Sequence, residues 1–413
     1  MGLGFTMRFP VHKRKGLLRE QYEAYFKGLT SPVPNWDVFT FFGDNWFEVR
    51  LVPFEESLYG EWVGDDLMLS SKTNSAGPGY HAYLIEVLDG LGVKPTNVDD
   101  ETGYYKSRDY AALQAQMAQW LQSMSVVLTD AMGKDFSNFA VSIALDWMPR
   151  TDDQLVCCPL GGFNKAFFER AKQGGDVGAE FFLWWNKGRD ALFYRNTALN
   201  MLLYAVNWLA PETNAERLDI AAALACLEQA YALDPNLQYP AAEWLELSKF
   251  SDNPDLAQTI SARFPNAGEP AIGYRRGNIE TNVFGWRFTH SGMMHMDRDE
   301  NGTFIQWDND KTIRTSTFTV EFKEDLPNKS ESLMESALDA TMEYEPFALD
   351  IDGSAARIAH KQIDENGEMV WYTSLVAALD NNLLILSLFY VNDDERQWAL
   401  DVCTSIKRNT NNS

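Results

Sequence analysis

The residues best suited to chemistry lie in the loop Asn74 to Gly79 and at the start of the helix expected after it. Backbone amides at the first turn of a helix hold anions, and the imidazole of His81 exchanges protons near neutral pH. With Glu86 or Asp89 as its acidic partner, His81 would serve as the base of a hydrolase. However, Pro78 removes one amide donor, and the phosphate-loop and nucleophile-elbow spacings are absent from the sequence. We therefore expect a Gly-Pro-Gly turn that aims the helix, with a hydrolase as the alternative.

Two histidines and two aspartates form the densest group of metal-ligating residue types, at His290, His295, Asp297 and Asp299. Zinc would need several of these side chains on one side of the chain. Positions 290 and 295 differ by an odd number, so on a single strand they point to opposite faces. The spacing therefore predicts no shared metal ion.

Asp297, Asp299, Asn301 and Asp308 match the opening and the twelfth position of a calcium loop. That loop normally ends in Glu and joins two helices, whereas this stretch ends in Asp between expected strands. Asp, Asn and Gly are also the residues that tolerate left-handed backbone in tight turns. We therefore predict hairpin turns here, keep calcium as the alternative, and expect no cofactor.

A run of acidic residues follows position 330, and a helix is expected over residues 331–344 with Ser330 or Ser332 as its cap. Steps of four residues place the first four carboxylates on one helix face. Such a face is usually only solvated, but it would also dock a basic protein partner. The acidic residues expected to bind this partner are Glu331, Glu335, Asp339, Glu343 and Glu345.

Large aromatic side chains gather between residues 181 and 194. Exposed, they would anchor an interface. Aromatic residues more often fill cores, so we expect core packing here. The members of this group are Phe181, Phe182, Trp184, Trp185, Phe193 and Tyr194.

The elements that must position these residues divide the chain into an α+β region, a helical region and a β-rich region. Residues 1–150 alternate short strands with helices, as at 15–29, 80–92 and 107–130, and are expected to form one α+β domain. Residues 151–265 are mainly helical. Residues 266–282 are rich in polar residues and Gly, which is typical of a linker. Residues 283–413 are expected to form an antiparallel sheet with flanking helices.

The helical region contains Ala222-Ala223-Leu224, Ala230 to Asn236 and Pro240, at about 215–248. These residues resemble the second helix and turn of a tetratricopeptide repeat. The resemblance covers one unit of the chain, and a self-standing array of such repeats normally needs three. It implies a helical hairpin packed into a larger domain, or else a groove for an extended peptide.

The C-terminal region runs from strands to an acidic helix, a strand pair, the strand NLLILSLFYV and a last helix with Trp398. This order resembles the PsbP-like or DcrB-like fold over roughly residues 310–410. The resemblance implies an α/β/α arrangement and no catalytic residues, because such domains usually bind other proteins.

The chain has 413 residues and a net charge of −24. This charge argues against a nucleic-acid partner, because phosphate would be repelled. No apolar run is long enough for a membrane helix, four cysteines make a poor disulfide framework, and the N-terminus lacks a secretory signal. We therefore expect a cytoplasmic protein that does not bind membranes.

An acidic, protein-binding chain is similar in style to bacterial immunity proteins, which neutralise toxins of contact-dependent or type VI secretion systems. This resemblance implies a non-catalytic protein that occludes the active site of a basic toxin. A chaperone or adaptor for a secreted effector, and the hydrolase built on His81, remain the alternatives. The oligomeric state is left open.

Overall fold

The structure is a computed structural model, and it describes residues 2–12, 16–54, 57–132, 139–141, 147–149, 155–299, 303–322, 328–365 and 367–409. Two compact units divide the chain. The first unit holds residues 1–145, 151–206 and 210–273, and the second holds 146–150, 207–209 and 274–413. The regions expected as separate α+β and helical domains thus fall mostly within one unit, and the expected linker straddles the boundary at residue 273.

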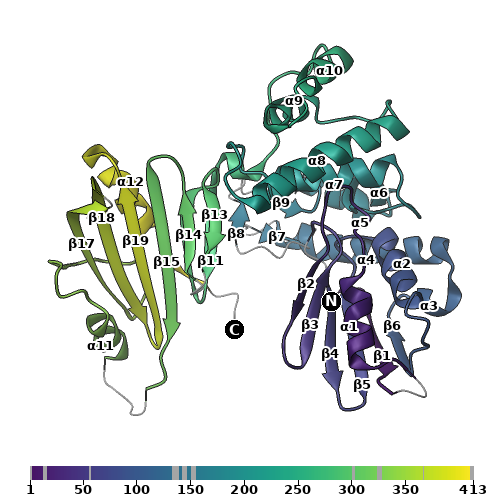
Figure 1. The fold of residues 1–413 in the computed structure, drawn as a ribbon, viewed down its shortest axis with the longest axis horizontal. Helices are drawn as coiled ribbons and strands as arrows, with labels where there is room; N and C mark the ends of the chain where they lie inside the picture. Colours follow the sequence, from purple (N-terminus) through teal and green to yellow (C-terminus); the bar gives the residue numbers. More distant parts are fainter. Residues whose placement is uncertain are drawn as a thin grey trace. The chain divides into compact units, whose positions relative to one another are not determined.

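A six-stranded antiparallel sheet organises the first unit, in the order β2-β3-β4-β5-β1-β6 (Figure 1). Buried residues alternate with more exposed ones along β3 and β5 and over most of β1 and β4, as the period of two requires. The strands are β1 (Gly4–Pro10), β2 (Phe39–Phe42), β3 (Trp46–Arg50), β4 (Leu58–Val63), β5 (Asp66–Lys72) and β6 (Asn97–Asp100).

One side of this sheet, which we call the inner face, packs against the helices α1 (Arg19–Lys27) and α2 (Pro78–Asp89). From α1, the Phe26 ring lies 5.0 Å from the Phe47 ring of β3. From α2, His81 contacts the Phe5 ring of β1 at 5.7 Å. The opposite side, the outer face, carries exposed and half-buried side chains.

Helices form most of the rest of the first unit, together with a small sheet in the order β10-β9-β7. The expected aromatic core is confirmed, because Phe181, Phe182, Trp184 and Phe193 are all buried. The elements are α3 (Tyr104–Ser107), α4 (Tyr110–Ala131), β7 (Phe139–Ala140), β9 (Leu155–Cys158), β10 (Gly161–Asn164), α5 (Lys165–Lys172), α6 (Gly178–Phe181), α7 (Ala191–Tyr204), α8 (Asn214–Leu233), α9 (Ala241–Leu247), η1 (Ser248–Phe250) and α10 (Leu256–Arg263).

The expected helical hairpin corresponds to α8 and α9, joined across the turn that starts at Asp234. Its second helix has only seven residues, and the main neighbour of α8 is α7. The tetratricopeptide resemblance therefore stays a prediction about local sequence.

Two antiparallel sheets build the second unit, in the orders β13-β14-β15-β19-β18-β17-β16 and β20-β12-β11-β8. Their strands are β8 (Trp147–Pro149), β11 (Asn278–Val283), β12 (Trp286–Ser291), β13 (His295–Arg298), β14 (Phe304–Trp307), β15 (Lys311–Thr319), β16 (Glu345–Pro346), β17 (Ser354–Glu365), β18 (Glu368–Leu379), β19 (Asn382–Tyr390) and β20 (Lys407–Arg408). The helical elements are η2 (Tyr274–Arg276), α11 (Lys329–Ser336), η3 (Asp393–Glu395) and α12 (Arg396–Thr404).

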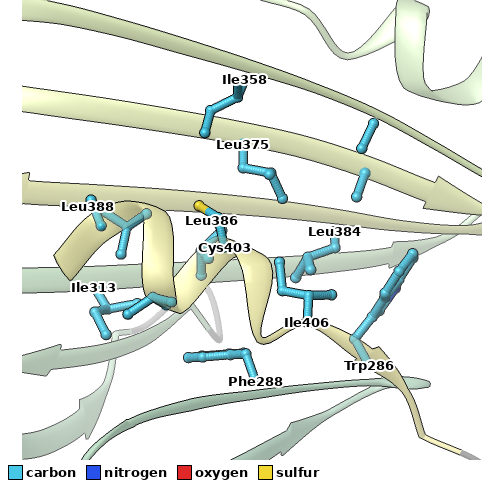
Figure 2. Close-up of a cluster of buried hydrophobic side chains, with 14 of the residues drawn as sticks. Trp286, Phe288, Ile313, Ile358, Leu375, Leu384, Leu386, Leu388, Cys403 and Ile406 are labelled. Atoms are coloured by element: carbon cyan, nitrogen blue, oxygen red, sulfur yellow. The ribbon is translucent and has the colours of Figure 1, made fainter. Parts of the chain in front are cut away.

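The core of this unit lies between the long sheet, the strand β12 and the helix α12. Figure 2 shows Trp286 and Phe288 of β12 on one side of α12, with Leu375, Leu384 and Leu386 of the long sheet on the other. The mixed α+β class expected from the sequence is therefore confirmed.

The stretch expected as one strand around His290 is divided between β12 and β13. Gly292 donates its N–H to Gly277 O, and a Cβ atom at this position would lie 2.7 Å from Arg275 Cα. This close backbone approach lies just after the end of β12, and His290 and His295 therefore lie on two different strands. No helix among the described residues is long and apolar enough to cross a membrane.

Candidate functional site

The His81 side chain is completely buried in the first unit. Its Nδ1 lies 2.9 Å from Thr73 Oγ1 and its Nε2 lies 3.1 Å from Thr102 Oγ1. The rings of Phe5 and Tyr104 pack edge-on against the imidazole. A substrate could reach either imidazole nitrogen of His81 only if the core opened, so the buried position of this side chain fits a structural role.

The carboxylate beside His81 is Asp100, whose Oδ1 lies 3.4 Å from His81 Nε2. Burial raises the pKa of Asp100, but hydrogen bonds from His81, the Tyr105 N–H and Thr102 outweigh this effect and hold the pKa below its usual range. The expected partner Glu86 is exposed, so the predicted His81–Glu86 pair is wrong. The other expected partner, Asp89, pairs with Arg108 at 2.7 Å.

The loop before α2 is docked on Trp184 and does not form an open anion cradle. Gly79 donates its N–H to Trp184 O, and the Trp184 N–H donates to Ala76 O. A Cβ atom on Gly79 would lie 2.0 Å from the Trp184 ring, and Gly77 has a φ of +105°. The expected Gly-Pro-Gly turn is therefore confirmed, and close packing is the reason for its glycines.

The expected calcium ligands lie in two different turns. Asp299 Oδ1 accepts from the Thr303 N–H before β14, whereas Asp308 Oδ1 accepts from the Lys311 N–H after β14. Asp297 lies on β13 opposite Ile305, and Asn301 falls outside the described residues. The predicted hairpin turns are confirmed, since β13, β14 and β15 pair in sequence.

His290 and His295 are both buried, on different strands and with different partners. The His290 Nε2 lies 2.7 Å from Thr281 Oγ1, and the His295 Nδ1 lies 3.1 Å from Asn207 Nδ2. Across the residues that the structure describes, no three His, Cys, Asp or Glu side chains are grouped closely enough to hold a metal ion.

The acidic residues expected on one helix face do not share a helix. The helix α11 ends at Ser336, and Asp339 instead accepts hydrogen bonds from the Thr341 N–H and hydroxyl. Glu331 pairs with Arg357 at 2.7 Å. The caps Ser330 and Ser332 were also wrong, because the residue before the helix is Asn328.

Four of these carboxylates are nevertheless exposed. Glu335 lies in the last turn of α11, Asp339 and Glu343 lie in the connection after it, and Glu345 lies on the edge strand β16. They form an acidic stretch at one edge of the long sheet.

The outer face of the six-stranded sheet carries the main cluster of exposed aromatic side chains. Of the twelve large apolar side chains exposed among the described residues, five lie on β2, β3 and β4 or at their ends. They are Phe39, Phe41, Trp46, Tyr59 and Val63, and we call them the aromatic patch.

Backbone pairing places these rings side by side. Phe41, Glu48 and Tyr59 lie in one row across β2, β3 and β4. The Trp46 and Tyr59 rings are nearly parallel, with centroids 6.4 Å apart and an angle of 14°. Trp46 also covers Gly43, where a Cβ atom would lie 2.4 Å from the indole nitrogen. The patch is therefore a fixed surface of the sheet.

The same row continues into a polar hollow of about 530 Å³ on the outer face. Beyond Tyr59, the row passes through Ser70 and Thr6 to Asp99 on β6. Lys72 and Glu101 also line the hollow. The Glu101 Oε2 accepts the Gly4 N–H at 2.8 Å, which fixes this carboxylate at the rim.

Sequence reasoning missed the outer face. The signal was present in Phe39 to Phe42, where aromatic residues occupy both parities of a strand. Only one parity can face the core, so the other must be exposed or bound to something. Without the position of α1, neither side could be preferred.

Comparison with known proteins adds little beyond the fold class. No family model matches the chain, and no curated protein matches it. A solved structure from Bacteroides thetaiotaomicron is similar with a TM-score of 0.26 and 11% identity, over 31% of this chain and 47% of that one. The chain thus spans about half the length of that structure. The solution structure of the cyanobacterial PsbP protein CyanoP from Synechocystis is similar with a TM-score of 0.24 and 12% identity, over 30% of this chain and 87% of that one. Similarities this small carry no functional argument. The mixed α+β class rests on the helices and strands of the structure itself.

Proposed function

We propose that the chain is a non-catalytic binding protein for a basic protein, and that the outer face of the six-stranded sheet is its docking surface. The aromatic patch is the observation that carries this proposal. Aromatic side chains dominate the binding energy of interfaces, because they bury a large area with little conformational entropy to lose. Exposed apolar groups gathered on one face mark such surfaces more often than isolated ones do.

Charge complementarity supports a basic partner. The chain carries a net charge of −24. On the outer face, Glu48 and Glu61 lie among the aromatic rings, and Asp99 and Glu101 line the hollow. A field of this sign accelerates association with a basic protein and slows association with an acidic one. The acidic stretch at Glu335 to Glu345 adds to this attraction.

The specific form that we propose is a bacterial immunity protein, which occludes the active site of a secreted basic toxin. Acidity and a broad, preformed binding face support this form, because a lethal target demands fast and tight capture. We also propose a cytoplasmic location, supported by the four cysteines, which are all buried thiols.

For the second unit we propose a PsbP-like arrangement. It is supported by the order of its elements, in which α11 precedes the strands β17, β18 and β19 and the helix α12 follows them. Domains of that kind usually bind other proteins, which agrees with a binding role for the chain.

A capture experiment tests the proposed function. Tagged protein is incubated with host lysate at low and moderate salt, and bound proteins are identified by mass spectrometry. We expect one basic protein in stoichiometric amount, lost when Trp46→Ser and Tyr59→Ser are combined. The control is Phe284→Ser, which removes a 73% exposed ring from the second unit and should leave capture unchanged.

Identification alone does not decide the question. The captured protein must also lose its toxicity when mixed with the wild-type chain, and keep it when mixed with the Trp46→Ser/Tyr59→Ser variant. Equal capture by the wild-type chain and by the Trp46→Ser/Tyr59→Ser variant, or capture of an acidic protein, would overturn the proposal. A captured protein that stays active in the complex would exclude occlusion.

A further inference from the structure

The polar hollow on the outer face combines three kinds of group that one ligand class can satisfy together. Carboxylates stand at one end, on Asp99 and Glu101. Hydroxyl groups of Thr6 and Ser70 line the middle, and the exposed Tyr59 ring closes the other end. Its volume of about 530 Å³ lies within the usual range for sites that bind small groups.

Backbone geometry sets the spacing of these groups. Asp99 lies on β6 and Glu101 directly follows the last residue of that strand, so their Cα atoms are at most about 7 Å apart. Tyr59 lies three strands away from Asp99 in the same row, which corresponds to about 14 Å. A ligand that reaches both ends therefore needs a cationic head and a neighbouring apolar group.

The outer face already shows how it holds a guanidinium group. Arg50 lies over the Phe41 ring at 5.4 Å, and its Nε donates to Glu48 Oε1 at 2.7 Å. A carboxylate and an aromatic ring thus hold an arginine of the chain itself. The hollow offers the same two groups, and among the described residues that line it the one cationic side chain is Lys72.

We propose that the hollow binds an arginine side chain of the basic partner, together with the apolar residue next to it. The guanidinium group lies against Asp99 and Glu101, where its fork of donors can bridge two carboxylates. The neighbouring apolar side chain packs on Tyr59. This inference rests on the proposed function, because it assigns the partner residue that the outer face recognises.

Lys72 provides an internal check on the sign of the ligand charge. Its ammonium group shares the hollow with the two carboxylates and competes with an incoming cation. Replacing it with a neutral residue should therefore strengthen the binding of an arginine ligand. The same change would weaken the binding of an anion, and a neutral sugar would be largely indifferent to it.

Peptide titration followed by NMR tests the proposal on the full-length chain. The probe is acetyl-Leu-Arg-amide, and the reference peptides carry Lys or the uncharged isostere citrulline in place of Arg. We expect millimolar binding of the Arg peptide, with amide shifts centred on Gly4, Thr6 and Ser70. Binding should be several-fold weaker for Lys and at least tenfold weaker for citrulline.

Variants locate the site. Asp99→Asn and Glu101→Gln should each weaken binding of the Arg peptide by about threefold to tenfold, and Lys72→Gln should strengthen it. The matched control is Asp252→Asn, an exposed carboxylate that belongs to neither the outer face nor the hollow, which should change nothing. Circular dichroism confirms that each variant is folded. The Asp99→Asn variant alone is enough to test the site, because the Asp99 side chain is exposed and its replacement should not disturb folding.

The results separate this inference from the proposed function. Equal binding of citrulline and Arg peptides, or unchanged binding by Asp99→Asn, would overturn the arginine site. If partner capture still depended on Trp46 and Tyr59, the docking surface would stand without it. The arginine peptide could also bind in the hollow while partner capture did not depend on Trp46 and Tyr59. That result would overturn the proposed docking surface and leave the arginine site standing.

Discussion

The His290 imidazole is held neutral inside the second unit. Its Nδ1 donates to Ser291 O at 2.8 Å, and its Nε2 accepts from Thr281 and from the Gln306 amide. Burial lowers the pKa of His290 to about 3, the bond to Ser291 opposes this shift, and the charge of Arg275 adds to it. This histidine therefore ties β11, β12 and β14 together only while it is uncharged.

Acid should weaken the chain through this residue. The unfolded state binds a proton near pH 6.5 and the folded state only near 3, so stability is complete above pH 6.5 and is lost as the pH falls toward 3. We expect the melting temperature to fall between pH 6.5 and 4, and to fall less steeply in His290→Asn. Parallel curves for the two proteins would contradict this assignment.

Individual residues also show why sequence reasoning found the wrong partner for His81. Glu86 lies five residues away and was chosen for its closeness in the sequence, whereas Asp100 lies nineteen residues away on β6. Only the pairing of β6 with β1 brings Asp100 beneath α2. A contact of this kind depends on the sheet order, which local spacing does not contain.

At the scale of elements, the longest strands could be predicted and the acidic helix could not. The strands β17, β18 and β19 lie where the expected strand pair and the strand NLLILSLFYV place them, because turn residues such as Asp, Asn and Gly bound these runs. The helix α11 stops at Ser336 although the acidic spacing continues. The Asp339 side chain bonds to the backbone at Thr341, and such bonds compete with helix formation without altering the pattern of residue types.

The helix α8 should depend measurably on its capping box. Thr213 Oγ1 accepts the Glu216 N–H at 3.1 Å, and Glu216 Oε2 accepts the Thr213 N–H at 3.1 Å. We expect Thr213→Ala to lower the free energy of unfolding by about 1 kcal/mol, because one helix-end donor loses its acceptor. Thr213→Ser keeps the hydroxyl and should cost much less. Denaturant unfolding measures both, and equal losses would mean that the methyl group matters instead.

At the scale of the whole molecule, charge sets the rate of association. Replacing Glu335 and Asp339 with Lys changes the net charge from −24 to −20, since each substitution adds two charges. We expect several-fold slower association with the captured partner at low salt, a weaker salt dependence and little change in stability. Stopped-flow mixing over a range of salt concentrations measures this rate.

A control with the same net charge makes that measurement specific. Asp130→Lys with Asp252→Lys changes two exposed carboxylates of the first unit. If this pair slows association as much as the Glu335 and Asp339 pair, the field of the whole chain is responsible. Unchanged kinetics in both would leave the outer face to act without electrostatic steering.

The aromatic patch also affects the tendency of the chain to self-associate. The patch includes Phe39 and Phe41 of β2, whose outer backbone groups form an edge of the sheet, and an edge with exposed rings is a template for aggregation. Mutual repulsion between strongly negative chains keeps these edges apart. That protection vanishes near the isoelectric point of about 4.6, so crowding and acidity together would convert the docking surface into a seed for precipitation. The colloidal stability of this chain thus depends on its negative charge. This charge protects a surface that must remain uncovered until the partner binds.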